Sequence, residues 1–417
     1  MADGDPITMN ALLQTVERLW PAARDVSVVS GRGAGAGGSD DQHLLVVPDA
    51  TSVRLLVPEQ RRAAAAAMRR YSAAISTREL VQRLLLGGAL RMTARWPLPD
   101  RVRISGPTGD SLQSHLGDVL GEHVTVSLGI GSIRANRKPV LGVFDRRGRA
   151  VAFVKVGDSP VSTAHVRGEA GALTTVGERT WRMLEVPELL YTGTWHGMFV
   201  LVMSTLAATA WQGRNSQWRV PDEAMAELAG AFDDGKMTLA ETPMWRKCIA
   251  AVDRIGDDSA RGRLATGLNG VAERHGSCRV SVGAWHGDFT PWNMARRRGR
   301  VQLWDWERFE TGVPVGLDRV HYVVHTLTRN RGFTATTVLD GVGRATSGLP
   351  GGPSANAAVG AAYLASLSCR YLAAAEGEGG EAIADHASVV VEALMEAGGR
   401  VASNGGARWS LRGTFDG

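Results

Sequence analysis

Residues 285–293 read WHGDFTPWN, and residues 301–307 read VQLWDWE. In the first stretch Asp288 and Asn293 are five positions apart, in what the sequence predicts to be a tight loop. In the second stretch Asp305 lies within a short, mostly apolar run that we predict to be a strand. An acid in an apolar strand is costly to bury unless it is paired or holds a metal. Oxygen ligands of this kind suit Mg²⁺, so the two stretches predict a magnesium site.

The order and spacing of these residues resemble the catalytic segment of protein kinases, where an aspartate is followed by an asparagine and a metal-binding aspartate. The His-Gly-Asp form, with Trp-Asp-Trp-Glu downstream, is more similar to the aminoglycoside phosphotransferase and choline kinase branch. The resemblance implies that Asp288 is the catalytic base and that Asn293 and Asp305 bind Mg²⁺. It also implies that His286 braces the loop through hydrogen bonds. A chance tripeptide beside an unrelated acid is the alternative, but the order and spacing favour the kinase-like interpretation.

Upstream, three consecutive strands are predicted over residues 123–128, 138–144 and 150–156. Glycines after the first strand, Gly129 and Gly131, would let backbone N–H groups approach phosphates, although an ordinary hairpin uses the same residues. Lys155, one of four lysines, lies inside the third strand. The resemblance implies that Lys155 holds the α- and β-phosphates of ATP, whereas the alternative is a lysine that snorkels from an edge strand. Lys138, at the hairpin entrance, is expected to matter far less for ATP use.

Kinases pair this lysine with a glutamate on the following helix, which we predict here over residues 166–184. Glu169 resembles the family's Glu-Ala-x-x-Leu pattern and is implied to be the partner, whereas Glu178 is expected to face water. The next apolar run resembles the last strand of the small lobe and its hinge. Backbone groups near Met203 and Ser204 are therefore implied to bind the adenine edge.

The first 115 residues are not covered by the resemblance and are predicted to form an accessory α/β block. We predict a helix over 9–19, a flexible loop over 30–42, strands over 44–47, 53–57 and 102–105, and one long or broken helix over 59–94. The charged residues of the helical segment 59–94 are almost all arginines. Such charge runs are typical of a solvated helix face, and a basic helix lying on an anionic membrane is the alternative.

After the catalytic segment, residues 312–318 are similar to the family's Gly-x-Pro-x-x-Asp pattern with one extra residue, which implies a bracing role for Asp318. Acids outnumber bases between residues 222 and 241. They would favour a cationic acceptor, and a solvated helix face is an equal alternative. Helices are predicted over 320–327, 334–342, 355–372 and 382–397, followed by a loose tail.

The composition is that of a soluble globular protein, with 44% hydrophobic and 21% charged residues among 417. A net charge of +5 without a clustered basic patch does not indicate a nucleic-acid partner. Three widely spaced cysteines are typical of reduced thiols. The N-terminus lacks a signal-peptide pattern, and no uninterrupted apolar run is long enough to span a bilayer. We therefore expect a cytoplasmic protein without an integral membrane segment.

Together these observations predict an α+β, two-lobed protein-kinase-like fold. The expected units are the accessory block (1–115), a nucleotide-binding N-lobe (116–206) and a helical C-lobe (207–417). The resemblance implies ATP and Mg²⁺ as cofactors and transfer of the γ-phosphoryl group to a hydroxyl of a small molecule, such as an aminoglycoside, a sugar or an amino-alcohol. A catalytically impaired nucleotide-binding or regulatory protein is the alternative. The presence of every expected catalytic residue favours the enzyme.

Overall fold

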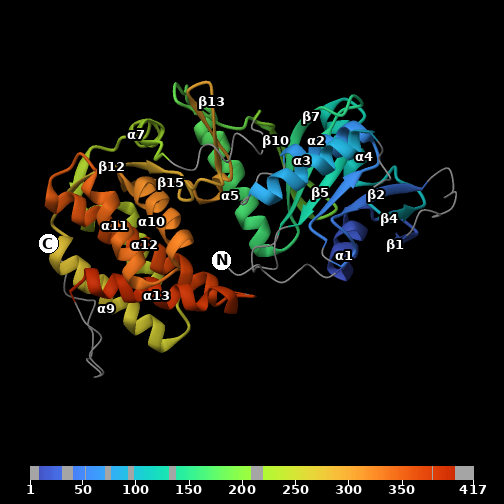
Figure 1. Cartoon of the computed structure of the whole chain (residues 1–417). Coiled ribbons are helices and arrows are strands. Elements are labelled where there is room, and N and C mark those ends of the chain that lie inside the picture. The colour runs from blue at the N-terminus through green and yellow to red at the C-terminus, as the bar shows by residue number, and fades with distance from the viewer. Residues whose placement is uncertain are drawn as a thin grey trace.

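The computed structural model describes residues 9–30, 41–51, 53–70, 77–92, 98–130, 138–207, 219–377 and 379–399. Two lobes lie beside each other (Figure 1). The N-terminal half forms a large sheet with a few helices, and the C-terminal half is mostly helical. This is the α+β, two-lobed architecture that the sequence predicted.

Nine antiparallel strands form the sheet of the first lobe, in the order β1-β4-β2-β3-β5-β6-β7-β10-β9. They are β1 (Asp25–Ser30), β2 (Gln42–Val47), β3 (Leu55–Pro58), β4 (Asp100–Ser105), β5 (Thr125–Ile130), β6 (Pro139–Phe144), β7 (Ala150–Gly157), β9 (Leu189–Trp195) and β10 (Met198–Ser204). All predicted strands of this lobe are present, and β1 and β9 were missed. The loop predicted over 30–42 lies mostly outside the described residues.

The N-terminal block and the predicted N-lobe share this sheet. Strand β3 pairs with β5, with Leu56 opposite Leu128. Residues from both parts also share one buried hydrophobic cluster, which includes Leu12 and Val16 of helix α1 (Met9–Leu19) and Val154 of β7. The predicted boundary at residue 115 falls inside helix α4 (Leu112–Leu120). The division into separate units stays a prediction.

The arginine-rich segment forms two helices, α2 (Arg61–Arg70) and α3 (Thr77–Met92). Buried residues of α2, among them Ala64 and Met68, pack in one cluster with Leu45 and Val57 of the sheet. Burial of small apolar side chains along one helix face is typical of a helix that covers a sheet. The packing therefore favours the interpretation of a covering helix with a solvated outer face.

Helix α5 (Pro160–Gly177) follows β7 and lies between the two lobes in Figure 1. Ser159 caps its N-terminus by accepting a hydrogen bond from the Ser162 N–H, and Pro160 occupies the first turn, where a missing N–H costs nothing. The helix ends at Gly177 rather than at residue 184 as predicted. The chain turns there to form β8 (Leu184–Glu185), which pairs with a strand of the second lobe.

The second lobe contains α7 (Asp222–Gly230), α8 (Pro243–Val252), α9 (Asp258–His275), α10 (Leu317–Arg331), α11 (Ala335–Ser347), α12 (Pro353–Ala375) and α13 (Glu381–Ala397). Two small sheets, β11 (Lys236–Thr238) with β12 (Arg279–Trp285) and β15 (Glu310–Pro314), and β13 (Met294–Arg297) with β14 (Arg300–Leu303) and β8, complete it. The four predicted C-terminal helices are confirmed as α10 to α13. The predicted tail lies outside the described residues.

Helix α12 is long and apolar enough, by length and composition, to cross a membrane, which the sequence analysis did not anticipate. Within the protein, however, 67% of its apolar window is buried. It packs against α8, α9 and α13, and its Tyr363 and Leu364 are fully buried in the main core. The apolar character of α12 therefore fits a central core helix.

Candidate active site

The residues between β12 and β13, 286–293, form a loop that we call the catalytic loop. Gly287 has a backbone φ of +79° and packs against the chain that follows β14. A Cβ at this position would lie 2.3 Å from the carbonyl oxygen of Arg308. A left-handed backbone in contact with another main chain accepts only glycine without strain. The glycine of the His-Gly-Asp motif is therefore a geometric requirement of this loop.

The Asp288 carboxylate is held at both oxygens. Its Oδ2 accepts a hydrogen bond of 2.8 Å from Asn293 Nδ2, and its Oδ1 lies 3.0 Å from His321 Nε2. Asn293 Nδ2 also donates to the Asp288 carbonyl, at 3.0 Å. Loss of hydration and the nearby Asp305 raise the pKa of Asp288. One third of the side chain stays exposed, so an oriented carboxylate with basic character faces the outside of the loop.

Asp318, in the first turn of α10, anchors the start of the catalytic loop. Its carboxylate accepts hydrogen bonds from the backbone N–H groups of His286, at 2.8 Å, and Gly287, at 3.1 Å. The extra residue before Asp318 does not displace it from the loop. His286 is fully buried against Trp306, and its Nδ1 accepts from the Asp288 N–H at 3.2 Å. Burial lowers the pKa of His286 to about 4, so the imidazole stays neutral.

The pKa of Asp318 predicts a pH-dependent stability. Burial raises this pKa to about 7, against the backbone hydrogen bonds that lower it. The folded protein therefore keeps the proton to higher pH than the unfolded chain, whose aspartates titrate near ~3.9. The stabilising contribution of protonated Asp318 is complete at pH values below the pKa of the unfolded chain. It is lost as the pH rises to about 7. Relative to Asp318→Asn, the wild-type free energy of unfolding should fall by up to ~1.4 kcal/mol per pH unit across this window.

This difference is measured by urea unfolding of both proteins at several pH values between these limits. The Asn variant keeps an acceptor for one of the two N–H groups and has no ionisation to lose. Other titrating groups cancel because both proteins carry them. Parallel pH profiles for the two proteins would show that Asp318 does not titrate in this range.

Lys155, on strand β7, contacts one carboxylate of helix α5 and one carboxylate of the second lobe. Its Nζ lies 2.5 and 2.6 Å from the two carboxylate oxygens of Glu169 on α5, and 2.5 Å from Asp305 Oδ1. Burial opposes the charge, but the carboxylates of Asp305 and Glu169 raise the pKa of Lys155. Strand β7 lies between β6 and β10, so the alternative of a lysine snorkelling from an edge strand is wrong.

Lys138, at the entrance of the hairpin as expected, also belongs to this cluster, and its smaller part in ATP use stays a prediction. Its ammonium binds the Glu307 carboxylate, and it lies 3.8 Å from Glu169 Oε2 and 3.9 Å from Asp305 Oδ1. Val140 pairs with Lys155 across the hairpin. Because side chains alternate along a strand, Lys138 projects from the same face and reaches Lys155 diagonally. Closing the predicted hairpin in this register would have revealed the pair.

Asp305 does not lie inside a strand as predicted. Strand β14 ends at Leu303, and Asp305 adopts a left-handed backbone with φ of 72° before a short 3-10 turn, Trp306–Arg308. This conformation is strained for a residue with a side chain. The ion pair with Lys155 compensates because it requires the carboxylate to turn away from the sheet.

The oxygens expected to bind Mg²⁺ fit that role. The backbone bond from Trp304 N–H to the Asn293 carbonyl, at 3.1 Å, joins the catalytic loop to the segment that carries Asp305. Among the described residues, no hydrogen bond uses Asn293 Oδ1 or Asp305 Oδ2. Both are hard oxygen donors of the kind that Mg²⁺ takes. The carboxylates of Glu169, Asp305 and Glu307 also converge, but two lysine ammoniums lie among them and balance their charge.

The other predicted binding residues are placed as follows. Gly129 lies inside β5, opposite Val140, and Gly131 lies outside the described residues. Met203 is buried in β10, and the Ser204 N–H donates to the Glu188 carbonyl at 2.8 Å. The phosphate and adenine roles of these four residues stay predictions. Glu178 is exposed at the end of α5, as expected.

Three of the acids between residues 222 and 241 make contacts that stabilise the fold. The Glu227 carboxylate accepts three successive backbone N–H groups, those of residues 182–184. Asp222 pairs with Arg319, and Glu241 completes a capping box with Thr238. These contacts favour the alternative to a cationic-acceptor surface.

Two contacts of the catalytic loop come from helix residues that belong to no sequence motif. Arg370 of α12 donates to the Gly287 carbonyl at 2.7 Å, and its guanidinium lies 5.1 Å from the centre of the Trp285 ring. His321 of α10 reaches Asp288. No spacing rule marks these two positions, because only helix packing brings them to the loop.

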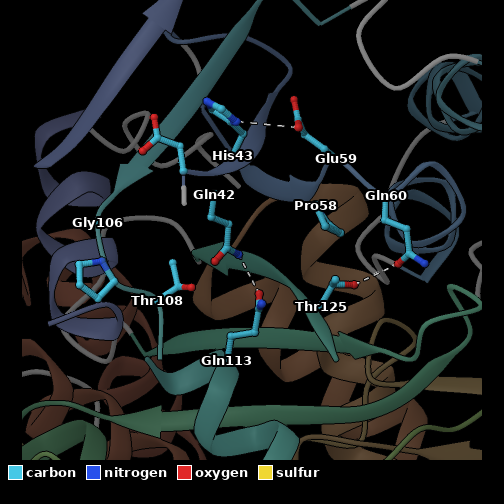
Figure 2. Close-up of a pocket in the computed structure, with 11 residues that line it drawn as sticks. Gln42, His43, Pro58, Glu59, Gln60, Gly106, Thr108, Gln113 and Thr125 are labelled. Atoms are coloured by element: carbon cyan, nitrogen blue, oxygen red, sulfur yellow. Dashed lines mark hydrogen bonds and ion pairs between the residues drawn. The ribbon is translucent and has the colours of Figure 1, made fainter. Parts of the chain in front are cut away.

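A separate hollow of about 520 Å³ lies in the N-terminal part of the sheet (Figure 2). Its polar side chains pair with one another: Gln42 with Gln113 at 2.8 Å, and Thr125 with Gln60 at 3.2 Å. None of its lining residues belongs to the catalytic loop or the lysine cluster. We therefore locate the chemistry at the catalytic loop rather than in this hollow.

A sheet carries a buried lysine paired with a helix glutamate, and a second lobe presents an aspartate, an asparagine and a further aspartate beside it. The chain has a protein-kinase-like fold. Within this kinase-like fold, the strands β5, β6, β7 and β10 and helix α5 correspond to the small lobe. The catalytic loop belongs to the large lobe. The expected resemblance to the aminoglycoside phosphotransferase branch is thus confirmed at the level of the fold.

Solved structures of small-molecule kinases are similar to this kinase-like chain. A thermostable mutant of aminoglycoside phosphotransferase APH(4)-Ia, in a ternary complex with ADP and hygromycin B, is 16% identical with a TM-score of 0.49, covering 70% of this chain and 99% of that one. An amicoumacin kinase in complex with AMP-PNP and Ca²⁺ is 11% identical with a TM-score of 0.38, covering 66% and 88%. No family model and no curated protein matches the sequence. At these identities and TM-scores, the kinase-like description rests on the chain's own geometry.

Proposed function

We propose that this protein transfers the γ-phosphoryl group of ATP to a hydroxyl group of a small molecule. The observation that carries the proposal is the Asp288 carboxylate, held at both oxygens and one third exposed. It lies on a loop bonded to the segment whose Asp305 meets Lys155. A base, an oxygen ligand pair and a phosphate-binding ammonium are the parts that phosphoryl transfer needs.

In this proposal Asp288 orients the acceptor hydroxyl and accepts its proton as the oxygen attacks the γ-phosphorus. The bond from the γ-phosphorus to the β–γ bridging oxygen breaks, and ADP leaves with the electron pair. Lys155, kept in place by Glu169, holds the α- and β-phosphates. Asn293 and Asp305 would hold Mg²⁺, which supplies charge neutralisation at the phosphates. The protein contributes mainly position and electrostatic stabilisation, because the reaction is an in-line displacement.

The acceptor is proposed to be a small molecule, in the cytoplasm, and its class stays open among aminoglycosides, sugars and amino-alcohols. A panel of these compounds, assayed for ATP consumption and phosphorylated product, tests the proposal. Single-turnover reactions with γ-labelled ATP separate an enzyme from the alternative, a kinase-like protein that binds nucleotide without useful turnover. Nucleotide binding without label transfer to any acceptor or to water would favour that alternative.

The metal assignment predicts a specific change in thermal stability. Mg·ATP should raise the melting temperature, because a ligand bound only by the folded state stabilises it. Asp305→Ala should abolish the Mg²⁺-dependent part of that rise, since it removes one of the two metal oxygens. The measurement compares melting temperatures with ATP plus EDTA and with ATP plus Mg²⁺. Full Mg²⁺ dependence in the variant would show that Asp305 is not a metal ligand.

A further inference from the structure

We infer that His321 is a positioning residue for the Asp288 base, in a hydrogen-bonded chain that runs from Tyr363 through His321 to Asp288. The inference rests on the proposed function of the catalytic loop. It assigns a role to a residue of α10 and one of α12, neither of which belongs to the catalytic motif. The acceptor hydroxyl would meet a carboxylate whose rotation is fixed by the large lobe.

The geometry of the chain is continuous. His321 Nε2 lies 3.0 Å from Asp288 Oδ1, and His321 Nδ1 lies 3.3 Å from the Tyr363 hydroxyl. Tyr363 is fully buried, and the His321 side chain is 3% exposed. The His321 ring packs edge-on against Trp285, with centroids 6.4 Å apart. The His321 ring is therefore shielded from water, whereas one third of the Asp288 side chain stays exposed.

The direction of both hydrogen bonds follows from charge. Burial and the nearby Arg370 lower the pKa of His321 well below its usual value, so the ring carries one N–H. An ionised carboxylate only accepts, so that N–H must be at Nε2 and must point to Asp288. Nδ1 is then an acceptor, and the Tyr363 hydroxyl donates to it. Burial raises the pKa of Tyr363, which keeps this hydroxyl protonated.

The consequence is a carboxylate fixed from two sides. Asn293 donates to Oδ2 and His321 donates to Oδ1. Rotation about the Cβ–Cγ bond of Asp288 moves both oxygens and would therefore break these hydrogen bonds. Each oxygen keeps a second lone pair for the acceptor hydroxyl. Efficient proton acceptance needs this orientation before the hydroxyl arrives. His325, with its ring centre 4.1 Å from that of His321, and Arg370 complete the surroundings.

A core histidine without a role in catalysis is the competing explanation, and a double-mutant cycle separates the two. His321→Leu should lower kcat by about 10- to 100-fold, as expected for loss of a hydrogen bond to a charged group, with KM for ATP unchanged. In an Asp288→Asn background the same change should cost little more, because His321 acts through the Asp288 charge. His321→Gln, which keeps a donor, should recover most of the rate.

Two further variants control for disturbance of the fold. Val324→Ala creates a cavity in the same helix at a buried position, so it should lower the melting temperature without lowering kcat of the folded protein. Tyr363→Phe removes only the second donor and should give a smaller loss of kcat than His321→Leu. Equal losses from His321→Leu in the wild-type and Asp288→Asn backgrounds, or no loss at all, would overturn the inference.

A measurement without turnover keeps the inference separate from the proposed function. In ¹⁵N-histidine NMR spectra of the whole protein, His321 should show a protonated Nε2 whose resonance shifts when Asp288 is changed to Ala. An unchanged resonance overturns the inference whatever the activity. If no acceptor takes up the γ-phosphoryl group while the resonance shifts as expected, the proposed function fails and the contact stands.

Discussion

The Asp288→Asn variant should lose at least about a hundredfold in kcat while it binds nucleotide nearly as well as the wild type. Asparagine keeps the size of the side chain but removes the charge that accepts the hydroxyl proton. General-base contributions are typically about 10²–10⁴-fold. The loss should fall on kcat, since the interaction is made only in the transition state. Steady-state kinetics with any verified acceptor and the Kd for AMP-PNP give the two numbers.

Asp318→Asn is the matched control for this variant. Asp318 accepts hydrogen bonds from the His286 and Gly287 N–H groups of the same loop. Among the described residues it forms no hydrogen bond with Asp288. Its change should alter the free energy of unfolding, with the pH dependence described above, more than it alters kcat of the protein that stays folded. A folded Asp288→Asn protein that binds ATP and turns over at a near wild-type rate would contradict the proposed mechanism.

Lys155→Met should have the largest combined effect on ATP use and on stability. Glu169 is completely buried, and its carboxylate meets the Lys155 ammonium at both oxygens. Removing one partner of a buried pair leaves a charge without compensation, which typically costs about 3–5 kcal/mol. The KM for ATP should rise strongly because the phosphates lose their ammonium. Chemical unfolding and ATP kinetics measure the two effects separately.

The double variant Lys155→Met/Glu169→Gln tests the origin of the instability. It should regain part of the lost stability, because the buried Glu169 charge is removed, and should not regain ATP use. Lys138→Met is expected to lie between wild type and Lys155→Met in both measurements, since Lys138 binds Glu307 and approaches the same carboxylates. A Lys155→Met protein with wild-type stability and KM would show that this cluster does not hold the nucleotide.

The sequence predicted the parts of the site that one motif or one strand fixes. The family resemblance implied that Lys155 and Glu169 form a pair, and the short spacing of Asp288 and Asn293 predicted that they lie on one loop. His321 and Arg370 were missed because their contact depends on how α10 and α12 pack against the loop. Side-chain periodicity marks a buried face but does not say which loop that face meets.

The prediction of the fold was limited in the same way, because pairings between distant segments could not be predicted. Three of the four strands of the N-terminal block, β2 to β4, were recognised from their apolar runs, yet the pairing of this block with the small lobe was not predicted. That union depends on β3 meeting the free edge of β5, which is a tertiary pairing. Asp305 was placed in a strand because the preceding residues are apolar. Strand β14 instead ends at Leu303, and Asp305 pairs with Lys155 from a left-handed backbone that the apolar pattern does not predict.

The continuity of the nine-stranded sheet has a mechanical consequence. The ladder runs without a break from β1 to β9, so the N-terminal strands cannot swing independently of the strand that carries Lys155. In the proposed function, any movement of the small lobe over a bound nucleotide would therefore move all nine strands together. A displacement of the edge strand β1 would be transmitted through the sheet to the strand that carries Lys155. The N-terminal block would thus be mechanically coupled to the proposed nucleotide site.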